Sequence, residues 1–207
     1  MNRNNNRNRS RKNRILILCQ GKTEEIYFKS FPVVQSDREW LINVFIESHS
    51  LDPKQLVNRA IEMRESAEQN SGQEYNTIWC VFDNDDFKQN FRKGIILADK
   101  ENIRTAFSIE SFELWLLLHF KKISIDSPLN REGYITELKK SGRLPNYEKK
   151  GLSLNHHISY SKLGKIKRKK AVTNSKELET KARLARRFYT KQNCTIHRLV
   201  EFLEALK

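Results

Sequence analysis

The chain has 207 residues, of which 38% are hydrophobic and 31% are charged, a composition typical of a globular domain in water. It contains no apolar run near the roughly 18 residues of a membrane span, and its basic start lacks the apolar core of a signal peptide. These features exclude the membrane classes and predict a cytoplasmic protein with no membrane partner. The three cysteines are odd in number and form no CxxC spacing, so neither a disulfide framework nor a zinc site is expected.

The formal net charge of +14 is concentrated in two short segments. Residues 1–14 hold six basic side chains and no acid, residues 165–170 hold five, and the rest of the chain is nearly balanced. Such segments bind nucleic acid without reading its sequence, although a solvated tail or a localisation signal has the same composition. The residues predicted to contact nucleic acid are Arg11, Lys12, Arg14, Lys165, Lys167, Arg168, Lys169 and Lys170.

The first half of the chain alternates between strand and helix patterns after a tail, residues 1–14, that is predicted to be disordered. Strands are predicted at 15–19, 41–47, 78–82 and 103–107, and helices at 23–32, 53–69 and 91–101. This order predicts an α/β fold with a mostly parallel sheet flanked by helices. Sheets of this kind bind ligands at the carboxyl ends of their strands.

The second half is basic and helical. Residues 114–118 are apolar all round, so this helix is expected to be enclosed by protein. Further helices are predicted near 130–140, 174–190 and 195–206, with 141–170 as a long loop or mobile element. The prediction is therefore a tail (1–14), an α/β domain (15–122) and a helical basic extension (123–207).

Two of the predicted buried strands end in polar residues, one at Gln20 and the other at Asp83, Asp85 and Asp86. Side chains two residues apart in extended chain lie on one face, where Asp83 and Asp85 can share a divalent metal with water and a substrate phosphate. The alternative is a turn that ends the strand without binding a metal, because such turns contain the same residue types. The arrangement suggests phosphate chemistry, and the residues alone leave the metal site and the turn both open.

Several segments resemble the RloB family, in the same order over about residues 15–203. They are QGKTEEIYF (20–28), WCVFDNDD (79–86), FELWLLLHF (112–120), YEK (147–149) and TIHRLV (195–200). The resemblance implies a Toprim-like domain and a metal-dependent nuclease that uses Mg²⁺, with Mn²⁺ as an alternative. It also implies a bacterial anti-phage or abortive-infection setting in which an ATPase partner is often encoded alongside.

In Toprim-type enzymes an Asp-x-Asp pair holds magnesium, and the resemblance places that pair on Asp83 and Asp85, with Asp86 as an extra ligand. The family's general acid or base, a glutamate after the first strand, falls on Gln20, which does not transfer a proton near neutral pH. Three explanations are open: an engineered inactivating change, a natural pseudo-enzyme, or transfer of the role to Glu24 or Glu25.

Three more residues are candidates for the chemistry, and each has a structural alternative. Glu24 matches a family position but also suits the first turn of a helix, where the dipole favours an acid. Glu113 opens the apolar helix, where an unpartnered carboxylate would be costly, so a metal or basic partner is expected. Lys149 follows a family Tyr-x-Lys pattern and could stabilise phosphate charge, or lie on the surface. His119 is interpreted as a core residue rather than a catalytic one.

The leading hypothesis is a metal-dependent endonuclease that cleaves DNA or RNA, with tRNA among the candidates, as a defence effector. The alternative is a non-catalytic subunit that binds nucleic acid or the ATPase partner through the same pocket. A third hypothesis is an effector that the partner holds inactive until infection. The substrate, the trigger and the oligomeric state, including a homo-oligomer, stay open.

Overall fold

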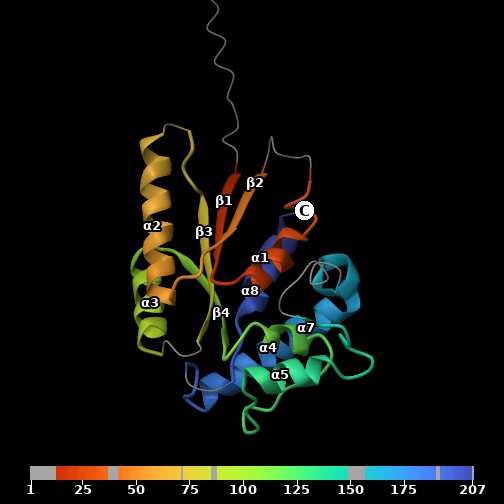
Figure 1. The fold of residues 1–207 in the computed structure, drawn as a ribbon. Coiled ribbons are helices and arrows are strands. Elements are labelled where there is room, and N and C mark those ends of the chain that lie inside the picture. The colour runs from red at the N-terminus through yellow and green to blue at the C-terminus, as the bar shows by residue number, and fades with distance from the viewer. Residues whose placement is uncertain are drawn as a thin grey trace, which may run out of the picture.

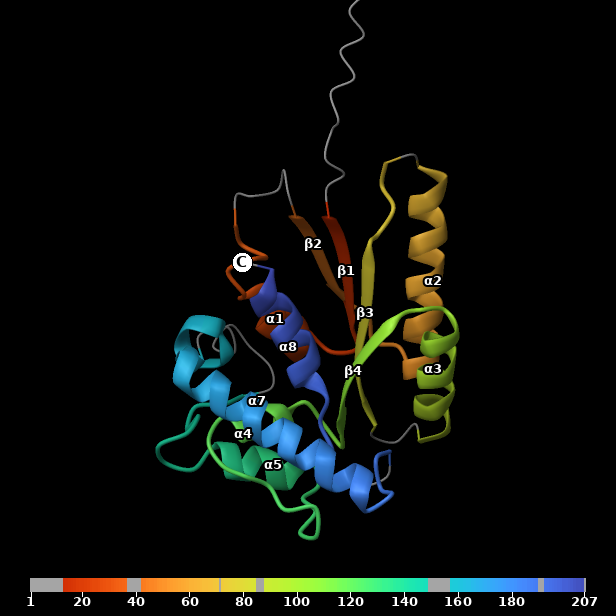
Figure 2. The same ribbon diagram turned by 180° about the vertical axis from the view of Figure 1, so that it is seen from behind.

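The computed structural model describes residues 13–36, 42–70, 72–84, 88–148, 157–189 and 192–206. Within these residues the strands form one four-stranded, all-parallel sheet in the order β2-β1-β3-β4, flanked by helices on both faces (Figures 1 and 2). The predicted α/β class with a parallel sheet is therefore confirmed.

The strands are β1 (Asn13–Cys19), β2 (Ile42–Ser48), β3 (Thr77–Asn84) and β4 (Arg104–Ile109). The helices are α1 (Lys22–Lys29), α2 (Pro53–Gln69), α3 (Lys88–Lys100), α4 (Glu113–Leu118), α5 (Arg131–Leu138), α7 (Tyr160–Leu184) and α8 (Ile196–Ala205). The start of α2 could be predicted because its signals are local: Asp52 and Gln55 form a capping box, and Pro53 lies in the first turn. The strands and the first three helices lie within a few residues of their predicted positions.

The sheet is buried on both faces because side chains alternate along each strand. In β1, Ile15 and Ile17 belong to one hydrophobic cluster and Leu16 and Leu18 to the other. Helices α1 and α8 cover the first face, with α4, α5 and α7 packed at its lower end in Figure 1, and α2 and α3 cover the second. The chain therefore builds two cores around one sheet.

The connections place a crevice between β1 and β3. The chain leaves β1 for β2 through α1 on one face, and it reaches β3 and then β4 through α2 and α3 on the other. Adjacent strands whose connections leave in opposite directions open a crevice at their carboxyl ends, where ligands bind in sheets of this kind. Gln20 and Asp83 lie at this point.

The helices after residue 123 complete the core that the sheet begins. The cluster on the first face joins Val81 of β3 and Trp115 of α4 to Tyr147 and to Leu199 of α8. The extension therefore shares a hydrophobic core with the α/β part. None of the described helices is long and apolar enough to cross a membrane.

Residues 193–195 also cover part of the free side of β4. Ile109 N donates to Asn193 O at 2.9 Å, and Thr195 N donates to Phe107 O at 2.8 Å. These bonds satisfy backbone groups that an edge strand otherwise leaves open.

The prediction of a long loop or mobile element at 141–170 was wrong for residues 160–170, which are helical. Helix α7 begins at Tyr160 and ends at Leu184, with an interruption at Gly164, whose φ of 67° lies in the left-handed region. The loop was predicted because the buried face of this helix is small or polar and carries little hydrophobic pattern. Its buried residues include Arg168, Ala171, Asn174, Ser175, Leu178, Glu179 and Ala182. Residues 149–156 lie outside the described part.

Helix α4 is the most enclosed element, as its all-apolar sequence predicted. Leu116 has no exposed surface, whereas Ile166 on α7 is 85% exposed. We expect Leu116→Ala to lower the free energy of unfolding by about 2–5 kcal/mol, because it removes packing and leaves a cavity. The control Ile166→Ala should stay within about 0.5 kcal/mol in the same urea titration followed by circular dichroism. Equal losses in the two variants would contradict the packing described here.

Candidate functional site

A pocket of about 750 Å³ lies at the carboxyl ends of β1 and β3, in the crevice that the topology opens. We call it the acidic pocket and define it by Gln20, Glu24, Asp83, Glu113 and Arg131. These residues come from the two strand ends and from the first turns of α1, α4 and α5. Residues more than a hundred positions apart in the chain therefore share one cavity.

The two strand ends are joined directly across the pocket. Gln20 N donates to Val81 O at 2.8 Å, which continues the pairing of β1 with β3, and Asp83 N donates to Gln20 Oε1 at 2.9 Å. Asp83 is 8% exposed, and its Oδ2 accepts a hydrogen bond from Phe112 N at 3.1 Å. The carboxylate is therefore held in place by a backbone donor. The two polar strand ends therefore meet at one edge of the sheet.

Glu24 reaches the pocket because residue 21 is glycine. A Cβ built on Gly21 would lie 2.5 Å from Glu24 Oε2, so the carboxylate rests against the bare backbone at the strand-to-helix turn. Glu24 is 4% exposed although it lines the pocket. Its orientation thus depends on the absence of one carbon atom next to the strand end.

Glu25, the other glutamate left open for proton transfer, lies outside the lining of the acidic pocket. Burial raises its pKa, but hydrogen bonds from Lys22, Lys29 and Ser48 outweigh burial and lower the pKa to about 2. A carboxylate with so low a pKa is a weak base at neutral pH. Its contacts join α1 to the end of β2, so Glu25 has a structural role.

Glu113 is held by a tyrosine from a distant loop. Tyr147 Oη donates to Glu113 Oε1 at 2.8 Å, and both side chains are at most 1% exposed. Burial and the charge of Glu113 raise the pKa of Tyr147 well above its usual value, so the phenol stays protonated and remains a donor. Tyr147 belonged to a recognised motif but had no predicted role; the structure shows that it orients Glu113.

The lining of the acidic pocket carries more acids than bases among the described residues. The acidic residues are Glu24, Asp52, Asp83 and Glu113, and the basic ones are Lys22 and Arg131. An excess of carboxylates opposes the entry of a phosphate unless a cation is present. The ionisable side chains of the described lining that can bind a metal are carboxylates, with no His or Cys among them. Such oxygen ligands suit Mg²⁺ or Mn²⁺ better than zinc.

Part of the predicted metal site cannot be placed. Asp85, Asp86 and Lys149 lie outside the described residues. Across the ranges that the structure describes, no group of three or more His, Cys, Asp or Glu is arranged to hold a metal ion. Asp83 is thus the one predicted ligand whose surroundings are known, and the residues present fit a hard cation by their chemistry.

Comparison with known families adds one finding. A model of the family described as RloB-like protein matches residues 15–203. The chain belongs to the RloB-like family. The matched range includes every residue that defines the acidic pocket. Neither the curated proteins nor the solved structures that were compared with the chain gave a match.

The basic residues of this RloB-like chain fall into different environments. Lys165, Lys167, Lys169 and Lys170 are exposed on α7, as a nucleic-acid contact requires. Arg168 is 4% exposed, and its Cζ lies 3.3 Å from the centroid of the Tyr160 ring. The Nε atom of Arg168 donates to Glu204 at 3.2 Å. Its prediction as a nucleic-acid contact is therefore corrected, because burial commits its guanidinium to packing.

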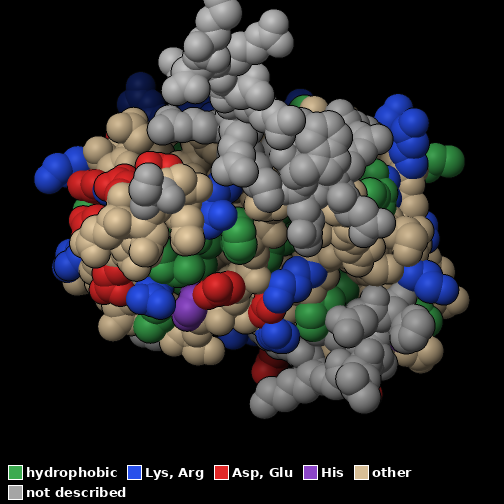
Figure 3. All heavy atoms as spheres, turned by 90° about the horizontal axis from the view of Figure 1, so that it is seen from above, with side chains coloured by type: hydrophobic (Ala, Val, Ile, Leu, Met, Phe, Trp, Pro, Cys, Tyr) green, Lys and Arg blue, Asp and Glu red, His purple; other side chains and the backbone are tan. Residues whose placement is uncertain are grey.

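The N-terminal basic segment is described only in part. Arg11 and Lys12 lie outside the described residues. Arg14 lies near the amino end of β1, with its Cζ 4.7 Å from the Phe45 ring centroid and 5.4 Å from that of Tyr75. The acidic pocket is at the other end of the same strand. On the face viewed in Figure 3, Lys and Arg lie among Asp and Glu rather than in a separate patch.

His119 has the surroundings of a core residue. It is 1% exposed, its Nδ1 lies 3.1 Å from Trp115 O, and burial lowers its pKa to about 4. The neutral ring therefore bonds to its own helix, which favours the structural interpretation.

Two features near the pocket were not predicted from the sequence: the backbone conformation of Glu110, which was only a weak candidate beside Glu113, and the position of Arg131. Glu110 has a φ of 75°, a left-handed conformation that is strained for a residue other than glycine. Arg131 Nη2 donates to the carbonyl of that residue at 3.4 Å and also lines the pocket. No sequence signal marks Arg131, one of 39 basic residues.

The contact between Gly21 and Glu24 predicts how two glycine substitutions differ. Gly21→Ala displaces only the end of a side chain, so its free energy of unfolding should change by less than about 1 kcal/mol. It should nevertheless move the Glu24 carboxylate away from the backbone of residue 21, which a crystal structure of the variant would show. In Gly94→Ala the new Cβ would lie 2.9 Å from the Pro53 backbone, so that variant should lose more stability. Similar destabilisation of the two proteins would count against the described position of Glu24.

Proposed function

We propose that the acidic pocket is the site of a Mg²⁺-dependent endonuclease, and that Gln20 occupies the position of its proton-transfer residue. The observation that carries the proposal is the bond between Asp83 N and Gln20 Oε1 at the topological switch of the sheet. Glu24 and Glu113 line the same cavity. The family resemblance supports the nuclease class, and the pocket supplies the carboxylates that such a site needs.

A cation in this pocket would be held by Asp83 together with Asp85 and Asp86, whose positions lie outside the described residues. When bound, it neutralises the negative charge that develops on a phosphodiester during cleavage. Tyr147 keeps Glu113 oriented toward the same cavity through its hydrogen bond. Arg131 supplies a guanidinium in the pocket, where it can pair with phosphate oxygens.

Gln20 limits the proton transfer that this chain can perform. Its amide oxygen accepts the Asp83 N–H, and a carboxamide neither takes nor gives a proton near neutral pH. A glutamate at this position could accept the same backbone N–H with one oxygen and turn the other toward the substrate. The pocket therefore accommodates a proton-transfer residue at position 20 without a change of backbone.

The second candidate function is a non-catalytic subunit that binds nucleic acid or a partner. The identity of residue 20 favours it, because the side chain that joins the two strand ends is an amide and not an acid. The defence setting, the ATPase partner, its restraint of the effector and the choice between DNA and RNA stay predictions of the resemblance.

Cleavage assays separate the two functions. Single-stranded DNA, duplex DNA and tRNA are incubated with Mg²⁺ or Mn²⁺ and the parent chain, Gln20→Glu, or Gln20→Glu combined with Asp83→Asn. We expect Gln20→Glu to cut at least about a hundredfold faster than the parent, the usual contribution of a general base. The double variant should be inactive while remaining folded.

Two outcomes would contradict this proposal. Silence of Gln20→Glu on all substrates, with Mg²⁺ binding intact, would favour the non-catalytic subunit. Cleavage by the parent chain that Glu24→Gln abolishes would show that the proton-transfer role lies on Glu24. The control Glu62→Gln changes an exposed acid on α2, whose side chain is 63% exposed, and should leave every rate unchanged.

A further inference from the structure

A second hollow, of about 780 Å³, lies beside the edge strand β4. We call it the β4-edge groove. It is open because residues 193–195 cover only the later part of β4, while Arg104 and Thr105 line the hollow. Helix α3 forms one wall, and the ends of α7 and α8 with the residues after α7 form the other (Figure 2).

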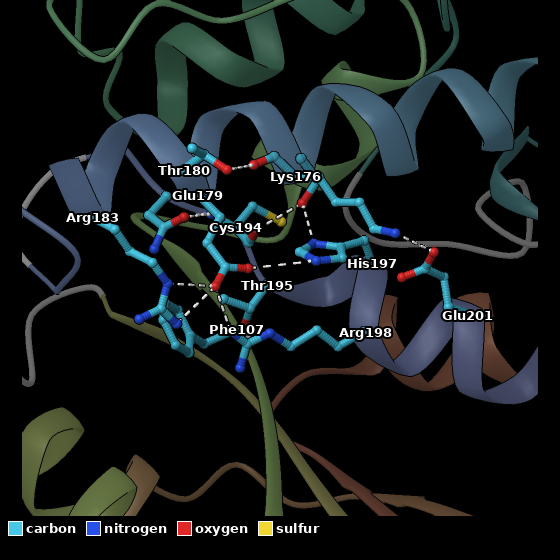
Figure 4. Close-up of polar contacts among 12 residues, drawn as sticks. Phe107, Lys176, Glu179, Thr180, Arg183, Cys194, Thr195, His197, Arg198 and Glu201 are labelled. Atoms are coloured by element: carbon cyan, nitrogen blue, oxygen red, sulfur yellow. Dashed lines mark hydrogen bonds and ion pairs between the residues drawn. The ribbon is translucent and has the colours of Figure 1, made fainter.

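Three arginines from three elements line this groove: Arg104 of β4, Arg183 of α7 and Arg198 of α8. Arg183 and Arg198 converge on Glu179 (Figure 4), with Arg183 Nη2 2.8 Å from Glu179 Oε1. Their side chains are still 55% and 39% exposed, so both present cationic surface that a buried carboxylate holds in position. Among the described residues that line the groove, Asp99 is the one acid. The groove therefore suits an anionic ligand.

Aromatic rings also line the groove, beside Arg183. Phe188 and Tyr189 pack edge to face with centroids 4.7 Å apart, and Phe107 lies 5.6 Å from Phe188. The Cζ atom of Arg183 lies 4.0 Å from the Phe188 centroid. Tyr189 is 36% exposed and lines the groove, so it offers ring surface for stacking. Guanidinium groups for phosphates beside an exposed ring for bases are the elements of single-strand recognition.

One hydrogen bond links the groove to the strand that carries Asp83. Asn84 Nδ2 donates to Tyr189 O at 3.0 Å, and Asn84 directly follows Asp83 in β3. Tyr189 is therefore anchored at the carboxyl end of β3. An acidic peptide would pair with the arginines but leave the exposed ring of Tyr189 without a stacking partner.

We propose that the β4-edge groove binds single-stranded nucleic acid. Duplex is excluded from the stacking contact because its bases are already paired and stacked. The binding itself is independent of cleavage; only its relation to substrate choice rests on the proposed function.

Fluorescence anisotropy tests this binding without metal, so that cleavage does not enter. The probe is a labelled oligonucleotide of roughly ten nucleotides, single-stranded or as its duplex. Ile96, which lines the groove and is 69% exposed, is changed to glutamate; Asn58→Glu, on the exposed side of α2, is the control with the same change in charge. Tyr189→Leu removes the aromatic face, and Tyr189→Phe keeps it.

We expect Ile96→Glu and Tyr189→Leu each to weaken single-strand binding by about tenfold, as the loss of one stacked base or one added repulsion does. Asn58→Glu and Tyr189→Phe should bind like the parent, and the duplex should bind more weakly. Parental affinity in Ile96→Glu and Tyr189→Leu would overturn the proposal. Two further results would overturn it. If Ile166→Glu were the only variant to lose binding, the interface would lie on the exposed lysines of α7. If poly-glutamate competed for the protein as well as an oligonucleotide does, the site would bind acidic polymers in general. Groove binding without cleavage by Gln20→Glu would refute the nuclease and leave this inference standing.

Discussion

The hydrogen bond from Asp83 N to Gln20 Oε1 is the contact on which the site depends. It joins β1 to β3 at the point where the connections of the sheet leave on opposite faces. The diverging connections open the crevice, and the bond lies beside it. Strands that are buried on both faces can present polar side chains only at their ends. The acidic residues of the pocket therefore gather where this bond holds the two ends together.

The same bond explains why an amide can stand at residue 20. A glutamate would accept the Asp83 N–H equally well, but it would add a negative charge to a cavity that already holds Asp83, Glu24 and Glu113. Like charges in a partly buried cavity repel, and a bound cation would compensate them. Compared with a glutamate, Gln20 therefore adds no negative charge to this cavity and offers no proton acceptor. Both differences follow from the amide group of Gln20.

The features that sequence predicted are those with a local cause. Buried strands that end in polar residues placed Gln20 and Asp83 together, and the Asp52 cap with Pro53 marked the start of α2. The first half of α7 was missed because its buried residues, Leu163, Arg168 and Ala171, give too weak a hydrophobic pattern to indicate a helix.

Features that depend on tertiary contacts could not be predicted in this way. Tyr147 and Glu113 are 34 residues apart, and only the folded chain shows that they bond. The inward turn of Arg168 and the exposure of Arg183 likewise follow from neighbouring helices, since both belong to the same basic helix. Asp85, Asp86 and Lys149 lie outside the described residues, and their roles stay predictions.

We propose that Asp83 holds a divalent cation in a pocket whose charge depends on residue 20. Titration of Mn²⁺ followed by electron paramagnetic resonance measures this directly for the parent, Asp83→Asn and Gln20→Glu. We expect Asp83→Asn to weaken Mn²⁺ binding by at least about tenfold and Gln20→Glu to strengthen it, with Glu62→Gln as the unchanged control. Equal affinity in the parent and in Asp83→Asn would contradict it.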